Sequence, residues 1–366
     1  MKPTRVAVVG CGLVGGSVAL ALARSEDHHV TAVFDSDPAT AVAAVESGAA
    51  ERGAASIADA VADADVVVVG VAVSDVAATV VAAVDAAPPT AVVTDVGSVK
   101  APIVAAVEAR LAPDAAARFC GGHPMAGSER QGFGAADAEL FGNAVWVLTP
   151  TPATEPDAIT RVARLAAATG ASPLSLPPDV HDAIVAVVSH VPHLAAATLM
   201  NVAQGRAGEA PVLRLAAGGF RDVTRIAAGS PRVWEDILAE NATAIRDVLD
   251  AYIVGLTTIR DDLGDRAALR ATLEAASKSR RELPIPEVAA DLTTLVVAIS
   301  DRPGAFAEIA NVLGAAGVNI VDVELRHSAE GGRGLLQVTV AAGHADGAVA
   351  ALAVRGHAAR IEDDLW

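Results

Sequence analysis

A histidine in a glycine-rich loop is the first residue whose type and position suggest chemistry. His123 lies in the segment Gly121–Glu129, between a glycine and a proline, after a short strand-like stretch. Such a loop gives no packing reason for an imidazole, whose ordinary pKa near neutrality suits a general base. A solvated loop histidine is the alternative. Ser98, in the segment Asp95–Lys100 that also follows an expected strand, is a second candidate.

Polar residues also interrupt the apolar stretches of residues 173–283. They include His181, His193 and, in the segment Gly218–Arg225, the pair Asp222 and Arg225 three residues apart. On a helix these two side chains share a face, and the carboxylate could orient the guanidinium toward a carboxylate of a ligand. A surface ion pair worth ~0–1 kcal/mol is the alternative.

The histidine spacing raises the question of a metal site. His190 and His193 are three residues apart, but Pro192 between them disrupts a regular helical turn. No cysteine pair and no HExxH motif accompanies them in the sequence. We therefore expect no bound metal.

The segment Gly10–Gly15 predicts a dinucleotide site. Its G-x-G-x-x-G pattern follows a strand-like segment and opens a helix-like one, which is the context that this motif requires. Asp35, 20 residues after Gly15, suits the ribose hydroxyls and would repel the 2′-phosphate of NADP, so we expect NAD. A tight strand–helix turn followed by a chance aspartate is the alternative. The residues expected at the cofactor are Gly10, Gly12, Leu13, Val14, Gly15, Asp35 and Lys100.

These candidates need a scaffold, and the order of strand-like and helix-like segments predicts one. Residues 1–172 alternate between the two kinds, which predicts an α/β Rossmann-type doubly wound parallel sheet. Within it, the apolar run Asp65–Val73 is expected to be a strand buried on both faces. Residues 173–283 show helical spacing without strand signals. They predict an all-helical substrate-binding domain, whose long apolar surfaces suggest a dimer.

The end of the chain predicts a third domain. Residues 284–292 are expected to be a linker, stiffened by Pro284 and Pro286 of the segment Leu283-Pro-Ile-Pro286. Residues 293–366 then follow the order strand–helix–strand–strand–helix with a possible last strand. This order is the ferredoxin-like α+β pattern.

Composition limits the partners and the location. The 366 residues carry a formal net charge of −17 and 3% aromatic residues, which argues against nucleic acid and anionic membrane surfaces as partners. The uncharged stretch Ala183–Gly205 has the length of a membrane span, but its polar residues, such as Pro192 and Asn201, favour a buried helix. The N-terminus has no signal-peptide pattern, and the two cysteines, Cys11 and Cys120, suit a reducing compartment. We therefore expect a cytoplasmic protein.

Taken together, the motifs closely resemble those of the prephenate/arogenate dehydrogenase family of tyrosine biosynthesis. The resemblance covers residues 1 to about 283 and rests on Gly10–Gly15, Asp95–Lys100, Gly122-His-Pro-Met-Ala-Gly-Ser-Glu129, His181-Asp182, Ser189-His-Val-Pro-His193 and Gly219–Arg225, in this order. The segments Asp301–Phe306 and Gly317–Ile320 are similar to those of an ACT domain, a module that often binds amino acids.

The resemblance implies an NAD-dependent oxidoreductase, a prephenate dehydrogenase, that converts prephenate to 4-hydroxyphenylpyruvate by oxidative decarboxylation. It implies that His123 accepts the proton or hydrogen bond of the ring hydroxyl and that Ser98 lies beside both. Arg225 would pair with a substrate carboxylate and be oriented by Asp222. The other residues implied at the substrate are His193, Gly218, Glu129, Trp234 and His181.

Other functions stay open. Arogenate dehydrogenase, which acts on the aminated side chain, is the main alternative. A dinucleotide-binding sensor would not account for the catalytic candidates, and a hydroxyacid dehydrogenase would not account for Gly219–Arg225. The ACT likeness implies regulation by an aromatic amino acid, with a purely structural role as the alternative. The residues implied for the effector are Asp301, Gly304, Asn319 and Ile320. The expected partners are a small-molecule substrate, this effector and a second copy of the chain.

Overall fold

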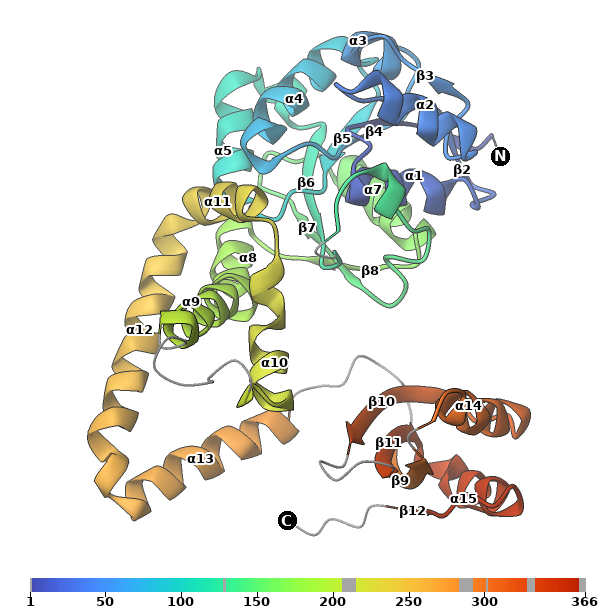
Figure 1. The fold of residues 1–366 in the computed structure, drawn as a ribbon. Helices are drawn as coiled ribbons and strands as arrows, with labels where there is room; N and C mark the ends of the chain where they lie inside the picture. The colour runs from blue at the N-terminus through green and yellow to red at the C-terminus, as the bar shows by residue number, and fades with distance from the viewer. Residues whose placement is uncertain are drawn as a thin grey trace. The chain divides into compact units, whose positions relative to one another are not determined.

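The computed structural model describes residues 2–127, 130–205, 215–282, 292–300, 302–327 and 333–361 (Figure 1). The chain divides into two compact units, Met1–Arg266 and Ala267–Trp366. The first contains a large sheet and the helices that follow it, and the second contains a smaller sheet with its own helices.

The first unit is built on one eight-stranded sheet. Its strands are β1 (Thr4–Val9), β2 (His28–Phe34), β3 (Arg52–Gly53), β4 (Val66–Val69), β5 (Val92–Asp95), β6 (Phe119–Pro124), β7 (Val145–Thr149) and β8 (Ser172–Ser175). They lie in the order β3-β2-β1-β4-β5-β6-β7-β8. The strands β1 to β6 are parallel, which confirms the predicted doubly wound sheet. β7 runs antiparallel to β6, and β8 runs parallel to β7.

Helices cover both faces of this sheet, because successive side chains of a strand point to opposite sides. Val6 and Val8 of β1 belong to one buried cluster, whereas Ala7 and Val9 belong to the other. Valine and alanine predominate in both clusters, as expected for a chain with few aromatic residues. The first face is covered by α1 (Leu13–Leu22), α2 (Pro38–Glu46) and α7 (Pro156–Ala168), and the second by α3 (Ile57–Val61), α4 (Val73–Ala86) and α5 (Ala101–Arg110). Two short helices, α6 (Pro113–Ala116) and η1 (Phe133–Ala135), lie in the connections.

The strand predicted over Asp65–Val73 is shorter in the structure. β4 ends at Val69, and α4 begins at Val73. A Cβ on Gly70 would lie 2.9 Å from the carbonyl oxygen of Gly10, so the backbone segments approach too closely there for a side chain. The strand therefore ends where the sheet meets the glycine turn.

The helical part of the first unit begins with one continuous run, Pro178–Gly205. It consists of α8 (Pro178–Val185), the π turn η2 (Ala186–His190) and α9 (Val191–Gly205). The amide of Val191 bonds to the carbonyl of Ala186, five residues back, and Pro192 has no amide hydrogen to continue an ordinary α-helical ladder. The extra residue in this turn changes the face that α9 presents relative to α8.

Further helices complete this part. They are α10 (Gly218–Thr224), η4 (Arg225–Ala228), α11 (Pro231–Glu240), α12 (Ala242–Asp261) and η5 (Asp262–Gly264). The next helix, α13 (Arg266–Arg281), belongs to the second unit except for its first residue. Residues 178–205 and 215–282 contain helices and no strand, as the sequence predicts. Their buried apolar cluster is small and is formed by Ala186, Val191 and Ile245 with partly buried neighbours.

Much apolar surface of these helices is exposed. Val187 and Val188 on η2 and Ile253 and Val254 on α12 are more than half exposed. The run Pro178–Gly205 is long and apolar enough to cross a membrane, but its apolar window is already 33% buried, and a core helix meets the same criteria. The exposed apolar face fits contact with another protein chain.

Besides most of α13, the second unit contains a four-stranded antiparallel sheet and the helices that pack on it. Its elements are β9 (Leu292–Ser300), α14 (Ala305–Ala315), β10 (Ile320–His327), β11 (Arg333–Ala341), η6 (Ala342–His344), α15 (Ala345–Val354) and β12 (Ala359–Ile361). The strand order is β10-β11-β9-β12, and Leu295, Leu313, Leu336 and Leu352 lie in its core. This order confirms the predicted ferredoxin-like pattern. Residues 284–291 of the expected linker lie outside the described residues. The domain boundaries at 172 and 283 stay predictions.

Candidate active site

Close backbone contacts shape the glycine turn between β1 and α1. Gly10 has a φ of +91°, and a Cβ on it would lie 2.6 Å from the carbonyl oxygen of Gly70. A Cβ on Gly15 would collide with the carbonyl oxygen of Gly10. The Cβ position of Gly12, by contrast, has no atom within 4 Å. The turn is therefore closed toward the sheet and open where a pyrophosphate would approach the start of α1.

Asp35 lies beside this turn, directly after β2. Its carboxylate accepts hydrogen bonds from the amide of Cys11 at 2.8 Å and from the amide of Asp37 at 3.0 Å. The backbone thus holds both oxygens in place, and each keeps a lone pair for a hydroxyl donor. A dinucleotide with an unsubstituted ribose fits this arrangement. Gly12 and the N–H groups at the start of α1 suit its pyrophosphate, and the Asp35 carboxylate suits its ribose hydroxyls.

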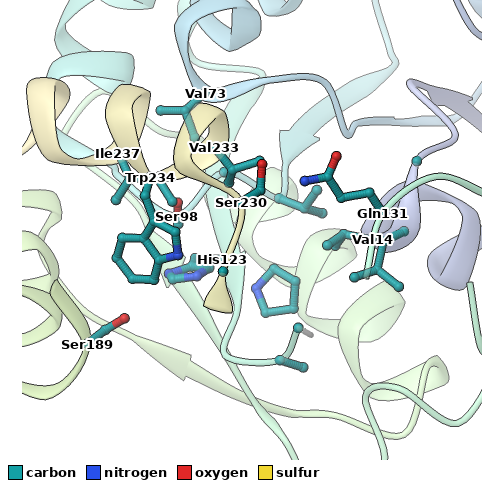
Figure 2. Close-up of a pocket in the computed structure, with 18 of the residues that line it drawn as sticks. Val14, Val73, Ser98, His123, Gln131, Ser189, Ser230, Val233, Trp234 and Ile237 are labelled. Atoms are coloured by element: carbon teal, nitrogen blue, oxygen red, sulfur yellow. The ribbon is translucent and has the colours of Figure 1, made fainter. Parts of the chain in front are cut away.

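A pocket of about 780 Å³ opens next to the glycine turn (Figure 2). Its size is typical of small-molecule sites. One side is formed by α1 and the segments that follow β4, β5 and β6, and the other by η2, α9, η4 and α11. The structure brings together at its wall eight of the predicted residues, Gly12, Leu13, Val14, Ser98, His123, His193, Arg225 and Trp234.

The charged side chains at this pocket are cationic. Among the lining residues that the structure describes, Arg130 and Arg225 carry a formal charge, and no carboxylate is present. Arg225 begins η4 and is exposed toward solvent. The pocket therefore favours a ligand that carries negative charge.

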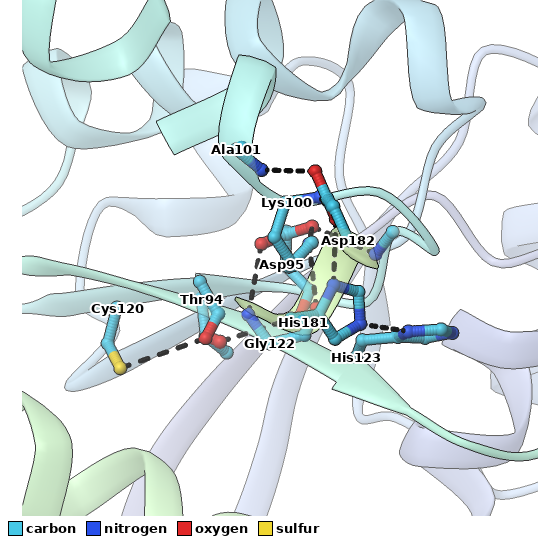
Figure 3. A network of polar contacts seen from close by, with 11 residues as sticks. Thr94, Asp95, Lys100, Ala101, Cys120, Gly122, His123, His181 and Asp182 are labelled. Carbon is cyan, nitrogen blue, oxygen red and sulfur yellow. Dashed lines mark hydrogen bonds and ion pairs between the residues drawn. The ribbon is translucent and has the colours of Figure 1, made fainter. Parts of the chain in front are cut away.

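The segment between β5 and α5 contains a fully buried ion pair, Asp95 and Lys100 (Figure 3). Asp95 also accepts hydrogen bonds from the amides of Gly97 at 2.8 Å and Gly122 at 3.1 Å. The Nζ of Lys100 donates to the carbonyl oxygen of Gly122 at 2.8 Å. Burial lowers the pKa of the Lys100 ammonium, and Asp95 partly offsets this effect. The pair ties the segment that carries Ser98 to the strand that carries His123.

This position does not support the predicted cofactor contact of Lys100. Its ammonium is fully buried, bonds to protein atoms and does not line the pocket. A buried ammonium needs such partners, because its lost hydration costs several kcal/mol. Lys100 therefore holds the protein framework of the site.

His123, on β6, lies between the pocket and a second histidine (Figure 3). Its Nδ1 is 2.8 Å from Nε2 of His181, and Nδ1 of His181 is 2.8 Å from Oδ1 of Asp182. Burial, followed by the neighbouring His181, lowers the pKa of His123 well below 6.5. The imidazole of His123 is therefore neutral near pH 7 and can accept a hydrogen bond.

The predicted substrate contact of His181 is corrected by this arrangement. His181 is 1% exposed, does not line the pocket and contacts His123 instead. The reason is its position on α8, where the adjacent Asp182 binds the first turn of α5. The carboxylate of Asp182 accepts hydrogen bonds from the amides of Lys100 and Ala101, each at 2.8 Å.

Two more histidines lie at the helical side of the pocket. The ring of His193 stacks on Trp234 with centroids 3.6 Å apart, and its buried Nδ1 has no hydrogen-bond partner among the described atoms. Nδ1 of His190 lies 3.1 Å from Nδ2 of Asn241, which also donates to the backbone carbonyl of Asp182 at 2.9 Å. Burial lowers the pKa of His190 to about 4. These contacts support the predicted placement of His193 and Trp234 at a ligand wall.

The predicted pairing of Asp222 with Arg225 is not formed in the described part of the chain. Asp222 is exposed on α10 and lies outside the pocket lining. Because α10 ends at Thr224 and the chain tightens into η4, the two residues do not share one regular helix. Gly218, at the start of α10, is also exposed and away from the pocket wall. Glu129 lies outside the described residues.

Sequence reasoning assigned no role to Asp95, Asp182, Asn241 or Arg130. Asp95 ends a buried apolar strand, an unusual place for a carboxylate, and this signal could have identified it. Asp182 was visible as the neighbour of His181. The contact of Asn241 with Asp182 joins residues 59 positions apart, and nothing local in the sequence marks it.

The predicted effector residues of the second unit do not meet within one copy of it. Gly304 precedes α14 with a φ of +86°, whereas Asn319 and Ile320 lie at the start of β10. Both β9 and β10 pair antiparallel with β11, so they run in the same direction, and these segments lie at opposite ends of the sheet. Asp301 lies outside the described residues.

Comparison with known proteins agrees with this geometry. Residues 18–174 match the family model described as prephenate dehydrogenase, nucleotide-binding domain, residues 177–274 match prephenate dehydrogenase, dimerization domain, and residues 293–355 match the ACT domain. A prephenate dehydrogenase of Bacillus subtilis is 33% identical over 345 residues, which are 93% of this chain and 92% of that protein.

Solved structures of similar proteins extend the comparison. A prephenate dehydrogenase from A. aeolicus, in complex with hydroxyphenyl propionate and NAD+, has a TM-score of 0.71 and 29% identity, covering 78% of this chain and 99% of that one. An arogenate dehydrogenase from Synechocystis has a TM-score of 0.66 and 28% identity, covering 77% of this chain and 100% of that one. These findings confirm the family resemblance, the fold class and the NAD-binding Rossmann domain that the sequence predicts.

Two glycine variants separate folding from cofactor binding. Gly12→Ala adds a methyl group in open space, so we expect an unchanged melting temperature and an NADH affinity at least about tenfold weaker, because the methyl enters the pyrophosphate position. Gly15→Ala meets the carbonyl of Gly10 and is expected to destabilise the protein by ~1–3 kcal/mol or more. Thermal melts and fluorescence titration with NADH measure both. A Gly12→Ala protein that binds NADH normally would contradict the placement of the cofactor.

The buried histidines predict a stability that depends on pH. The unfolded chain binds protons at His190 near pH 6.5, but the folded chain binds them only near pH 4, so the unfolded state holds more protons between these values. The free energy of unfolding should therefore be highest above pH 6.5 and fall as the pH drops toward 4. Urea unfolding at pH 5 and pH 7.5 measures this. His190→Gln should reduce the difference between the two pH values; a difference as large as that of the wild type would contradict the assignment.

Proposed function

Since this chain belongs to the prephenate dehydrogenase family, we propose that it is an NAD-dependent prephenate dehydrogenase that converts prephenate to 4-hydroxyphenylpyruvate. One observation carries the proposal. A neutral histidine, His123, and an arginine, Arg225, line the same pocket as the open glycine of the dinucleotide turn. This set provides an acceptor for the substrate hydroxyl, a cation for its carboxylate and a place for the hydride acceptor.

The chemistry of the substrate agrees with the charges of the pocket. Prephenate carries a ring hydroxyl at C4, a ring carboxylate and a pyruvyl side chain that ends in a second carboxylate. Arg225 and Arg130 are the charged groups among the described lining residues, and an arginine can bind a carboxylate through two parallel hydrogen bonds. Arogenate carries an ammonium group in place of the keto group. The described wall offers no carboxylate to that ammonium, which favours prephenate.

The residues of the chain have distinct roles in this proposal. The turn Gly10–Gly15 and Asp35 hold NAD, which accepts the hydride that leaves C4 of the substrate. His123 accepts the hydrogen bond of the C4 hydroxyl, and Ser98 lies beside it. Arg225 binds a carboxylate, and the stacked rings of His193 and Trp234 exclude water from one side.

The reaction itself sets what His123 must do. Hydride leaves C4 with its bonding pair, and the electron pair of the ring–carboxylate bond enters the ring as CO₂ leaves, so the ring becomes aromatic. The C4 oxygen ends as a phenol, and no proton is released overall. His123 therefore needs to stabilise the hydroxyl as positive charge develops at C4, which a neutral, fixed acceptor does best.

A second candidate function is arogenate dehydrogenase. The likeness to the arogenate dehydrogenase from Synechocystis favours it, since the coverage and identity are close to those of the prephenate dehydrogenase from A. aeolicus. The two reactions share hydride transfer and decarboxylation and differ at the side chain. The pocket charges weigh against this candidate.

We also propose that the protein acts as a homodimer with a regulatory ACT domain. The match to a dimerization domain and the exposed apolar face of η2 and α12 support a dimer. The match to the ACT domain supports binding of an amino acid such as tyrosine. The cytoplasmic location stays a prediction.

A single set of assays tests substrate and cofactor together. We expect prephenate with NAD+ to give the highest kcat/KM of the four combinations of prephenate or arogenate with NAD+ or NADP+, because the described pocket wall is cationic and Asp35 repels a 2′-phosphate. Reduced cofactor is followed by its absorbance. Arg225→Ala should mainly raise the KM for prephenate. A higher kcat/KM with arogenate would replace the proposed substrate, and a higher kcat/KM with NADP+ would replace the cofactor.

The regulatory role is tested with the full chain. Tyrosine added to the assay should lower the initial rate at subsaturating prephenate, and calorimetry should detect its binding. Because Gly304 and Asn319 lie at opposite ends of one sheet, the effector site needs more than these two segments of a single copy. No heat and no inhibition by tyrosine, phenylalanine or tryptophan would leave the ACT domain with a structural role.

A further inference from the structure

We propose that the buried pair His181 and Asp182 holds His123 in the tautomer whose unprotonated Nε2 serves the substrate. His181 is then a positioning residue that acts through His123. The proposal deepens the function above, and its kinetic test rests on that function.

Asp182 anchors this chain of contacts, and each of its carboxylate oxygens accepts a hydrogen bond from a backbone amide. Its Oδ1 accepts from the amide of Lys100 and lies 2.8 Å from Nδ1 of His181, and its Oδ2 accepts from the amide of Ala101. Both amides belong to the start of α5, where the helix dipole favours a negative charge. Both oxygens of Asp182 therefore act as acceptors at this position, and the residue is 4% exposed, so water does not replace these donors.

The protons of the two histidines follow from this acceptor. A carboxylate can only accept, so Nδ1 of His181 carries a hydrogen. In the neutral ring, Nε2 of His181 is then unprotonated and accepts the hydrogen bond that joins it to Nδ1 of His123 at 2.8 Å. Nδ1 of His123 must therefore carry its hydrogen, which leaves Nε2 of His123 as the bare nitrogen.

The fold makes this chain of contacts rigid. His181 is 1% exposed and lies on α8, and Asp182 fastens α8 to the first turn of α5. Asn241, which lies between α11 and α12, donates a hydrogen bond to the backbone carbonyl of Asp182 at 2.9 Å. Figure 3 shows the contacts in sequence from Ala101 through Asp182 and His181 to His123. The imidazole of His123 is thus held from the side opposite to its free nitrogen.

The pair also supports the charge that develops during the reaction. As hydride leaves C4, the hydroxyl proton shifts toward Nε2 of His123, and the ring gains imidazolium character. The hydrogen on Nδ1 then bonds more strongly to His181, whose own Nδ1 hydrogen points at the Asp182 carboxylate. The shared proton returns to the oxygen as the ring becomes aromatic, so the step begins and ends with the same protonation states.

Substitutions of His181 test the kinetic consequence. His181→Phe keeps the buried ring but removes the acceptor for Nδ1 of His123, so we expect kcat to fall about 10²-fold or more with KM values for prephenate and NAD+ within about threefold. His181→Gln offers an amide oxygen as acceptor and should retain more of kcat than His181→Phe. His28→Phe, at a buried histidine of β2, is the control and should keep the wild-type kcat.

The kinetic outcomes are decisive once folding is verified by thermal melts. A folded His181→Phe protein with kcat within threefold of wild type would overturn the proposal. So would equal losses in His181→Phe and His181→Gln, because a purely steric role predicts no rescue. Asp182→Asn gives a second variant, in which an NH₂ group replaces one of the two acceptor oxygens. The amides of Lys100 and Ala101 and Nδ1 of His181 then no longer all have an acceptor, and we expect kcat to fall.

A spectroscopic test does not depend on turnover. Nitrogen NMR of ¹⁵N-histidine-labelled full-length protein distinguishes protonated from bare ring nitrogens, and His123→Asn identifies the signals of His123. We expect a protonated Nδ1 and a bare Nε2 in the wild type. A proton on Nε2 of His123 would overturn the proposal even in an active enzyme. If neither prephenate nor arogenate reacts, the proposed function fails, and the tautomer is still decided by this measurement.

Discussion

The carboxylate of Asp182 is the contact on which the geometry of the site depends. Asp182 lies on α8, the first helix of the helical part, and accepts hydrogen bonds from the amides of Lys100 and Ala101, where α5 begins beside the sheet. The initial amides of a helix have no partner within the helix, so a buried acceptor there stabilises both the helix and the contact between the two parts. Through His181, the same carboxylate reaches His123. The Asp182 side chain thus both fixes α8 against α5 and, through His181, orients the imidazole of His123.

A second buried charge fixes the other half of the site by the same principle. Asp95 and Lys100 are both fully buried, and their remaining bonding capacity is directed to Gly97 and Gly122. Such a pair is weak evidence for net stability, because desolvation offsets much of the attraction. The pair instead favours one conformation of these segments, because movement of either partner would leave a buried charge without its counter-charge. The segments that carry Ser98 and His123 are therefore held in one arrangement.

The helical part leaves much of its apolar surface exposed. Its buried cluster is small, whereas valine, isoleucine and leucine side chains on η2, α9, α11 and α12 are exposed. Apolar surface of this kind is stabilised when another chain covers it. Arg225 and Trp234 stand on elements of this same part, so the wall of the pocket depends on helices that a dimer would stabilise.

The sequence by itself determined the kind of protein. The Gly10–Gly15 turn, the alternation of segments and the order of motifs predicted the Rossmann-type sheet, the helical domain and the ferredoxin-like end, because local spacing and turn chemistry control these features. It also marked His123, Ser98 and Arg225 by residue type. The tertiary structure decided what each polar group touches. Lys100 and His181 turned out to be buried supports, Asp222 lies apart from Arg225, and Asp95, Asp182 and Asn241 gained roles. Contacts between residues tens of positions apart depend on how helices and strands pack, which no local pattern encodes.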